Sequence, residues 1–560
     1  MSSPRPPRWA DALSGRISRR DLMRRSAAVG LAVPVASLLA ACGSTGSSGS
    51  SSTSFGPSNT LIVATTVSDA VTLDPNVAYE FSSVGADRLM YDTLVRFPFG
   101  NLAQVGPSLA TSWTHSSDGK TWTFKLKPGV KFSSGNTVTA DDVVYSFQRA
   151  VSIAKNPASW LITQTGITDK NVTDTVKATD ANTVTMTLPD TFSPGAWLAV
   201  LANTAAAVVD SKVVKAHVAN GDWGQTWLNS NSAGSGPYIL NNWTRDVKIE
   251  MHANTNYNLG SAPAIKRLLW QNVANNATQL DMINKGEADM ATDLSADQLA
   301  TLANNSKVTV FKTPDEAMQY VGMDVGNVKA FKDPRVLQAV KYSIDYQGII
   351  TNLLRGNATI LQGIIPQGIF GYTNKTYFTR DTAKAKQLLT AAGYPNGFSV
   401  TMLVPQGTAS GGVDAASLGD AIRSNLADVG INVSLRQLAS SEMYTQYRNH
   451  QAQMILANWG MDYPDPQDFA APFGDYTQQS LIWRLQDNDT QLSKLVQQAA
   501  TMENTPQRQA LYNQINDLEA TQGPFALLYQ PDVTRAYSTS IKNFKYDAAN
   551  GVNYPDLSKS

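Results

Sequence analysis

The feature that most constrains the fold is an alternation of strand-like and helix-like segments along most of the chain. Runs rich in β-branched and apolar residues, such as "TLIVATT" at 60–66 and "FSVTMLV" at 398–404, are typical of strands. Segments such as 333–354 and 415–430 carry apolar residues at the three- and four-residue spacing of helices. This alternation predicts α/β lobes. Because 560 residues are too many for one simple core, we expect two or more lobes.

The first 41 residues have the layout of an export signal. The basic stretch "SRRDLMRR" at 18–25 precedes an apolar run of about fifteen residues, which is short for a membrane span. The Ser-Arg-Arg-x-Leu-Met pattern resembles a twin-arginine signal, although a basic Sec signal can look similar. We therefore predict that 1–41 directs export and leave its route open.

The only cysteine, Cys42, ends the sequence "LAAC", which resembles the lipobox of bacterial lipoproteins. That resemblance implies a lipid on Cys42 and anchoring to the outer face of the cell membrane. The alternative is a buried free cysteine in a short anchor helix. Residues 43–54 contain only Gly, Ser and Thr, so 42–57 is predicted to be a flexible tether.

Charge is distributed unevenly along the chain. Residues 1–41 carry seven Arg and two Asp, whereas the remainder carries 38 basic and 43 acidic residues. No basic block follows residue 41, which argues against nucleic acid as a partner.

The stretch "WGMDYPDP" at 459–466 is the strongest candidate for a functional site. It follows the apolar strand-like run "AQMILANW", and a strand that ends in a sharp turn can point a carboxylate into a cleft. Asp462, Asp465 and Asp468 recur every three residues, but a calcium loop needs alternate acids, a central glycine and a final glutamate. We expect Asp465, which lies between two prolines, to stabilise the turn. For Asp462, the alternative to pointing into a cleft is that its side chain only caps this turn.

Other chemistries find little support in the sequence. The four histidines are scattered, so no metal site is predicted. No nucleophile elbow, His-Glu-x-x-His helix or phosphate loop is visible, so no catalytic residue and no cofactor is expected. A peptidase stays as a remote alternative, because a site that holds peptides could also cut them.

Seven stretches in family order, covering about 60–535, resemble the family 5 extracytoplasmic solute-binding proteins of ABC importers. The resemblance implies an α/β two-lobe clamp of the periplasmic-binding-protein type, with an extra subdomain inserted in lobe I. The stretches are "PSLATSWTHSSDGKTWTFKLKPGVKFSSGNTVTADDVVYSFQRA", "GSGPYILNNW", "NTNYNLGSAPAIKRL", "GEADM", "FKDPRVLQAVKYSIDYQGI", "AKQLLTAAGYPNGFSVTMLV" and "ILANWGMDYPDPQDF". Carried over, lobe I is 58–95, 228–318 and 528–560, the inserted subdomain is 96–227, and lobe II is 319–527.

The same resemblance implies a binding site made by both lobes. In peptide-binding members, the acid at the position of Asp462 pairs with the α-ammonium group of the ligand, and main-chain groups of its segment bind an extended peptide. A segment of lobe I faces them. The implied substrate-binding residues are Asn458, Trp459, Gly460, Met461, Asp462, Tyr463, Tyr79, Glu80 and Phe81.

The ligand expected from the resemblance is a peptide, delivered to an ABC permease by a monomeric receptor. Dipeptide-type members hold the ligand's carboxylate with an arginine in the loop that corresponds to 405–416, which has no basic residue here. An oligopeptide therefore fits better than a dipeptide. The alternative is a non-peptide solute, such as an oligosaccharide or a nickel chelate, in the same fold.

Overall fold

The computed structural model describes residues 56–102, 104–153, 157–189 and 192–560. The predicted export signal, Cys42 and the tether as far as residue 55 lie outside the described residues. The folded body is the unit Phe55–Ser560. No helix in the described ranges combines the length and the apolarity that a membrane crossing requires.

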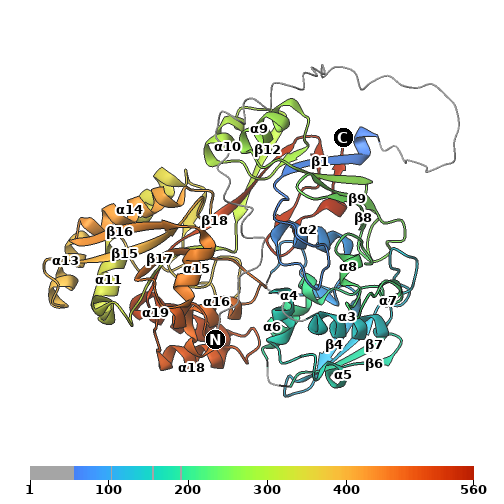
Figure 1. The fold of residues 1–560 in the computed structure, drawn as a ribbon, viewed down its shortest axis with the longest axis horizontal. Helices are drawn as coiled ribbons and strands as arrows, with labels where there is room; N and C mark the ends of the chain where they lie inside the picture. The colour runs from blue at the N-terminus through green and yellow to red at the C-terminus, as the bar shows by residue number, and fades with distance from the viewer. Residues whose placement is uncertain (1–55, 103, 154–156, 190–191) are drawn as a thin grey trace, which may run out of the picture. The chain divides into compact units, whose positions relative to one another are not determined.

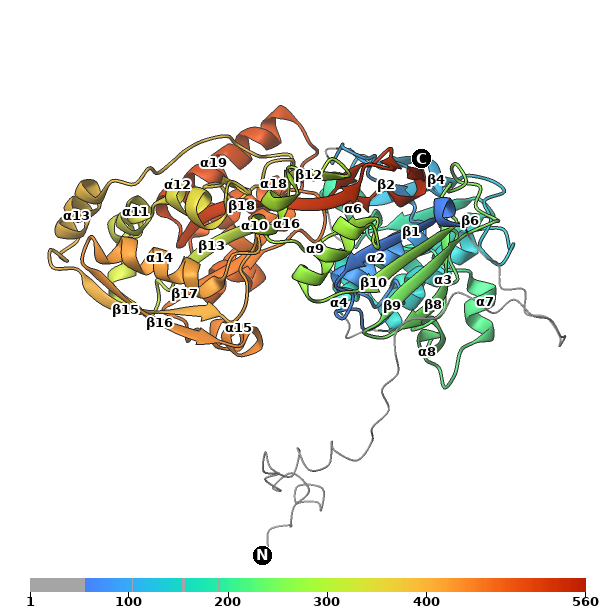
Figure 2. The ribbon, with the colours of Figure 1, turned by 90° about the horizontal axis from the view of Figure 1, so that it is seen from above.

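One mixed sheet extends through the body, and β18 is the strand that its two halves share. The order is β16-β15-β17-β13-β18-β11-β1-β10-β9-β8, with β12 and β14 also paired to β18. The first half of β18 pairs with β13 and the second half with β12, and Figures 1 and 2 show it in red between two groups of strands. The strands are β1 (Thr60–Thr65), β8 (Tyr238–Thr244), β9 (Lys248–Ala253), β10 (Arg267–Asn272), β11 (Met290–Ala291), β12 (Val308–Pro314), β13 (Met318–Met323), β14 (Ala358–Ile360), β15 (Phe398–Pro405), β16 (Ile431–Leu438), β17 (Met454–Trp459) and β18 (Phe525–Ser538).

Helices cover both faces of the half that contains β1. Side chains alternate between the two faces of a strand. Leu61 and Val63 of β1 pack with α2 (Phe81–Met90) on one face, whereas Ala291 and Ala536 pack with α9 (Asn276–Lys285) and α10 (Ala296–Leu302) on the other. This arrangement forms the first lobe of the clamp.

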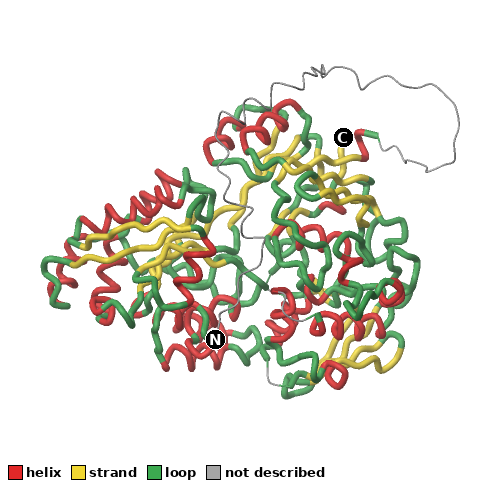
Figure 3. The backbone as a smooth tube through the Cα atoms, viewed as in Figure 1, coloured by secondary structure: helices red, strands yellow, loops and turns green. Residues whose placement is uncertain are grey.

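The second lobe is built on β13, β15, β16 and β17, flanked by helices (Figure 3). Its helices include α11 (Pro334–Ser343), α13 (Thr382–Ala391), α14 (Ala415–Ala427), α15 (Ser440–Arg448), α16 (Gln467–Gly474), α17 (Leu481–Arg484), α18 (Thr490–Ala499) and α19 (Pro506–Gln522). The continuous helix predicted at 333–354 is wrong. α11 stops before Ile344, which has an extended backbone, and α12 (Tyr346–Gly348) and a π-helical turn (Ile349–Leu353) follow.

A smaller sheet lies within the segment predicted to be an inserted subdomain. Its order is β4-β5-β7-β6, and α3 (Ala140–Ser152) starts at a capping box between Thr139 and Asp142. The alternating sequence after the Pro-Gly turn at 128–129 is typical of a strand, but none forms there; Lys131 makes only an isolated bridge to Thr137. The elements are β4 (Ala110–His115), β5 (Thr121–Leu126), β6 (Val176–Asp180), β7 (Thr183–Thr187), α4 (Pro157–Thr163), α5 (Val172–Thr175), α6 (Pro194–Leu201), α7 (Ser211–Ala216) and α8 (Gln225–Leu228).

The core of this smaller sheet continues into the helices that follow β17. Trp122 and Phe124 of β5 belong to the same apolar cluster as Phe469 of α16 and Tyr512 of α19. The residue bounds given above for the lobes and for the inserted subdomain stay a prediction.

Candidate functional site

Asp462 lies in the loop between β17 and α16, where it meets residues from elsewhere in the chain. The hydroxyl group of Tyr79, just before α2, donates a hydrogen bond to the Asp462 carboxylate. Nδ2 of Asn203 donates to the Asp462 main-chain oxygen at 3.0 Å. Two of the residues predicted to face each other across a binding site, Tyr79 and Asp462, are therefore in contact.

A second carboxylate, that of Asp468, lies beside Asp462. Oδ2 of Asp468 accepts the Asp462 main-chain N–H at 2.8 Å, and its main-chain oxygen accepts Nε1 of Trp459 at 3.1 Å. Burial, followed by the charge of Asp462, raises the pKa of Asp468 well above its usual value. Burial also raises the pKa of Asp462, while the Tyr79 hydrogen bond opposes the rise.

No Lys, Arg or His in the described part of the chain neutralises these two acids. Within the described residues, neither Asp462 nor Asp468 forms an ion pair with Lys, Arg or His. Two close carboxylates without a positive partner favour either a shared proton or a bound cation. The sequence pattern suggested Asp468 only as a calcium ligand and did not reveal its pairing with Asp462.

Asp465 points away from this pair and is bound into the fold. Its two carboxylate oxygens accept a bidentate pair of bonds from Arg508 of α19, both at 2.9 Å, and both side chains are buried. Oδ1 also accepts the Gln467 main-chain N–H at 2.9 Å. The three acids at three-residue spacing therefore do not converge on one point.

The end of β17 has an unpaired edge. β13 pairs with β17 along its whole length, from Met454 to Trp459, whereas β15 pairs with it only at Met454 and Ile455. Beyond Ile455, the described strands leave the other edge of β17 without a partner. Asn458 and Trp459 thus carry main-chain groups to which an extended ligand could be added.

The remaining predicted residues differ in exposure. Phe81, the first residue of α2, is 92% exposed, whereas Tyr463 is 3% exposed and packs in the core, so its side chain cannot serve as a contact surface. Gly460 is exposed, and Met461 and Glu80 are partly buried. Glu80 is the N-cap residue of α2, but its side chain caps no helix N–H.

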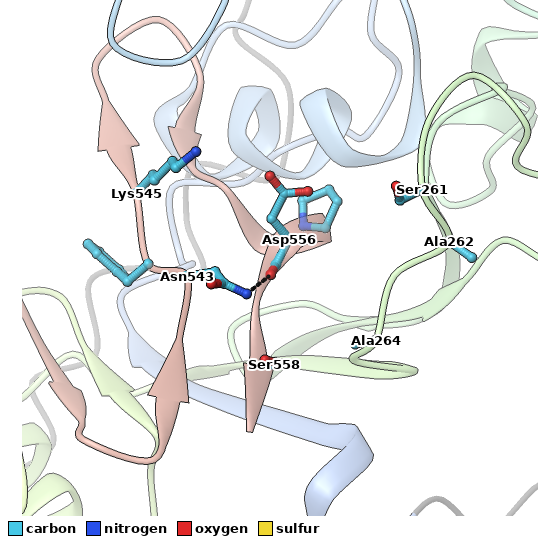
Figure 4. A pocket seen from close by; sticks show the side chains of 9 residues that line it. Ser261, Ala262, Ala264, Asn543, Lys545, Asp556 and Ser558 are labelled. Atoms are coloured by element: carbon cyan, nitrogen blue, oxygen red, sulfur yellow. Dashed lines mark hydrogen bonds between the residues drawn. The ribbon is translucent and has the colours of Figure 1, made fainter. Parts of the chain in front are cut away.

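A cavity of about 410 Å³ lies elsewhere, in the first lobe. Figure 4 shows it between the loop at Ser261–Ala264 and the C-terminal segment with Asn543, Lys545 and Asp556. None of the predicted binding residues lines it. Its polar groups are partly used by the fold, since Nδ2 of Asn543 donates to the Asp556 main-chain oxygen at 3.3 Å. We therefore base the candidate site on the acid pair rather than on this cavity.

The two-lobe α/β fold defines a class, the periplasmic-type binding proteins. The solved structure of DppA from Helicobacter pylori in complex with the peptide STSA has a TM-score of 0.73 and 24% identity, and it covers 89% of this chain and 98% of that one. At this identity the likeness establishes the fold.

Sequence comparisons identify the family. Residues 104–480 match the model of the bacterial extracellular solute-binding proteins, family 5 Middle, and the chain belongs to this family. It is 28% identical to a probable D,D-dipeptide-binding periplasmic protein, DdpA of Escherichia coli K12, over 87% of this chain and 92% of that one. It is 25% identical to the glutathione-binding protein GsiB of Shigella dysenteriae over 88% of this chain and 94% of that one.

Proposed function

We propose that this solute-binding protein captures short peptides between its lobes and delivers them to an ABC permease. The observation that carries the proposal is the acid pair of Asp462 and Asp468, which has no cationic partner among the residues that the structure describes. The relatives named for D,D-dipeptide and glutathione binding support a peptide-like ligand. An oligopeptide is favoured over a dipeptide because 405–416 has no basic residue to hold a nearby carboxylate.

In the proposed complex, Asp462 binds the α-ammonium group of the peptide. An ammonium group buried without a partner costs several kcal/mol, so the acid imposes a requirement for a free amine. The unpaired edge of β17 at Asn458 and Trp459 supplies main-chain hydrogen bonds, which bind a peptide whatever its side chains. Phe81 supplies an exposed apolar surface for a ligand side chain.

We also propose that the receptor works as a monomer anchored outside the cell. Cys42 carries the lipid, and 42–57 tethers the body to the membrane. The lobes and the inserted subdomain have the bounds given in the sequence analysis. Release of the lipid by removal of the residues up to Cys42 should leave peptide affinity unchanged, because the proposed site lies wholly in the body.

Calorimetric titration tests the ammonium role directly. Tetra-alanine should bind at least about tenfold more tightly than its N-acetylated form, a difference of about 1.4 kcal/mol or more. Asp462→Asn should lose a similar factor for the free peptide and lose the discrimination between the two forms. Asp281→Asn, an exposed acid on α9, is the control and should keep both affinities.

Two results would contradict the proposal. Equal affinity for the free and acetylated peptides would remove the ammonium role of Asp462. Thermal stabilisation by an oligosaccharide or a nickel chelate, with none by peptides, would replace the peptide by another solute, since a ligand stabilises the form that binds it.

A further inference from the structure

The start of α6 contacts the second lobe at a place separate from the acid pair. The Oγ of Ser193, the N-cap residue of α6, donates to the Met502 main-chain oxygen at 3.1 Å. A Cβ added to Gly195 would lie 3.0 Å from Oδ2 of Asp465 and 3.6 Å from Nη1 of Arg508. Because Gly195 has no side chain, the first turn of α6 reaches the buried ion pair of Asp465 and Arg508.

The surface that receives α6 is held in place from within the second lobe. Arg508 donates to the side-chain oxygen of Asn504 as well as to Asp465. Oδ1 of Asp465 accepts two bonds, from Arg508 and from the Gln467 N–H, whereas Oδ2 accepts one bond from Arg508 and faces Gly195. A carboxylate oxygen is favourable at this position, because the N-terminus of a helix carries partial positive charge.

Apolar packing extends the same contact. Ala196 and Trp197 of α6 are fully buried and belong to the same apolar cluster as Phe469 of α16 and Tyr512 of α19. Apolar surface that is removed from water at this contact favours the docked arrangement. Groups of the protein therefore complete this contact by themselves.

α6 is fixed to the first lobe, so its contact with the second lobe crosses between the two. Nδ2 of Asn76, which precedes α2, donates to the main-chain oxygen of Ala205 at 2.9 Å, just beyond α6. Arg149 of α3 donates to the side-chain oxygen of Asn76 at 2.7 Å and forms a buried ion pair with Asp74. In Figures 1 and 2, α6 lies beside α16 of the second lobe.

The loop after β17 meets both ends of α6. Asp465 faces its first turn, and Asn203, two residues after its end, donates Nδ2 to the Asp462 main-chain oxygen at 3.0 Å. Eight helical residues span about 12 Å, so α6 lies along this short loop. The proposed ligand group at Asp462 and the first turn of α6 thus act on the same four residues, 462–465.

We propose that the first turn of α6 is a latch, which docks on Asp465, Arg508 and Met502 and holds the lobes closed independently of the ligand. The inference goes beyond the proposed function, since it concerns the equilibrium between open and closed lobes rather than the solute. A ligand that binds the closed form gains apparent affinity when that form is already populated. The absence of a side chain at position 195 keeps the closed form populated.

A side chain at position 195 tests the latch without any ligand. Small-angle X-ray scattering of the ligand-free protein should give a radius of gyration about 1 Å or more larger for Gly195→Val than for the unaltered protein, with Gly195→Ala in between. Gly56→Val is the matched control, because Gly56 has an ordinary φ of −69° and no atom within 4 Å of an added Cβ. Equal radii for Gly195→Val and the unaltered protein overturn the latch.

Gly195→Ala separates undocking from unfolding. Alanine is a better helix former than glycine, so this change does not weaken α6 itself. If Gly195→Val loses the circular dichroism of the folded protein, the radius of Gly195→Ala decides in its place. A radius equal to that of the unaltered protein then overturns the latch.

Peptide binding gives an independent check. Tetra-alanine should bind Gly195→Val at least about tenfold more weakly than the unaltered protein, although position 195 lies outside the proposed ligand site. An undiminished affinity overturns the latch. Equal affinity of the unaltered protein for the free and N-acetylated peptides refutes the ammonium role of Asp462 and leaves the latch standing. If no peptide binds, the proposed function fails and the scattering comparison alone decides the latch.

Discussion

At the residue scale, three acids with the same spacing have three different surroundings. Asp465 is held by a bidentate arginine, Asp468 by main-chain groups, and Asp462 by a tyrosine hydroxyl. The carboxylate of Asp465 has a structural role, because removing one partner of a buried ion pair leaves the charge of the other partner uncompensated. The carboxylates of Asp462 and Asp468 lie beside each other. Their proximity determines how the stability of the ligand-free protein depends on pH.

Asp468→Asn should change the pH dependence of stability. An acid whose pKa is raised by folding binds a proton in the folded state that the unfolded chain has released, so its presence costs stability as pH rises from about 3.9 through the folded pKa. The pKa of Asp468 is raised well above its usual value. The melting temperature of the ligand-free variant, minus that of the unaltered protein, should therefore increase as the pH rises above about 4.

The asparagine keeps the hydrogen bond, since its side-chain oxygen can still accept the main-chain N–H of Asp462. Asp281→Asn, an exposed acid of α9, serves as the control variant. Parallel melting curves for Asp468→Asn and the unaltered protein across this range would show that the acids do not interact as described.

The sequence alone predicted some of these residues and missed others. The contact between Tyr79 and Asp462 agrees with the resemblance, which placed both in one site, while their binding role stays a prediction. Asp468 was missed because nothing local distinguishes it from any other acid in the first turn of a helix. Its significance comes from its contact with Asp462 and from the lack of a cationic partner among the described residues, which only the folded chain reveals.

At the element scale, the motif "GSGPY" fixes the end of α2. A Cβ on Gly234 would lie 2.0 Å from the Met90 main-chain oxygen, and one on Gly236 would lie 2.5 Å from the Met90 carbonyl carbon. The Gly236 N–H donates to the same oxygen at 3.0 Å. The glycines therefore allow two main-chain segments to touch, and this contact positions the end of α2.

Gly234→Ala should be strongly destabilising because its methyl group meets main-chain atoms that cannot rotate away. We expect a loss of about 3 kcal/mol or more in the free energy of unfolding, measured by urea denaturation. Gly221→Ala is the matched control. Gly221 has a φ of +75° but no atom within 4 Å of an added Cβ, so only about 1 kcal/mol of backbone strain is expected. Equal losses in the two variants would mean that α2 moves freely and that the contact is not a constraint.

The broken helix after Pro334 shows where periodicity fails as a guide. Apolar spacing continues through 333–354, so the sequence predicted one helix. The structure interrupts it at Ile344, and the Asp345 side chain then caps a new turn by accepting the Gly348 N–H at 2.9 Å. An aspartate inside a helical pattern offers the main chain such a local alternative. Asn425 of α14 supports the break by accepting the Asp345 N–H at 2.8 Å, a long-range contact that no periodicity reveals.

At the scale of the whole molecule, the two-lobe fold was predictable and the continuity of its sheet was not. Alternating segments and chain length indicate α/β lobes, but strand order depends on pairings between distant residues. β18 pairs with β13 and β14 in its first half and with β11 and β12 in its second. The expected start of the last lobe I segment, residue 528, lies inside this continuous strand rather than in a loop.

Gln530 of β18 joins the segments that pass between the two halves of the sheet. Its buried side chain donates to the main-chain oxygens of Asp315 at 2.6 Å and Gln367 at 3.0 Å, and it accepts the Gln367 N–H at 2.8 Å. Asp315 lies between β12 and β13, and this segment and β18 both pass between the lobes. The Gln530 amide therefore links these two connections to each other and to the loop of the second lobe at Gln367.

Gln530→Met should therefore weaken the body as a whole. The apolar side chain has a similar shape but removes three hydrogen bonds to main-chain groups of Asp315 and Gln367, which we expect to cost about 2–4 kcal/mol. Scanning calorimetry should show a melting temperature several degrees lower. Gln437→Met, on the exposed side of β16, is the control and should melt with the unaltered protein. Because β18 runs unbroken through both halves, the loss should appear in the transition of the body as a unit. Destabilisation confined to one of two separate transitions would mean that Gln530 serves a single lobe and that the lobes unfold independently.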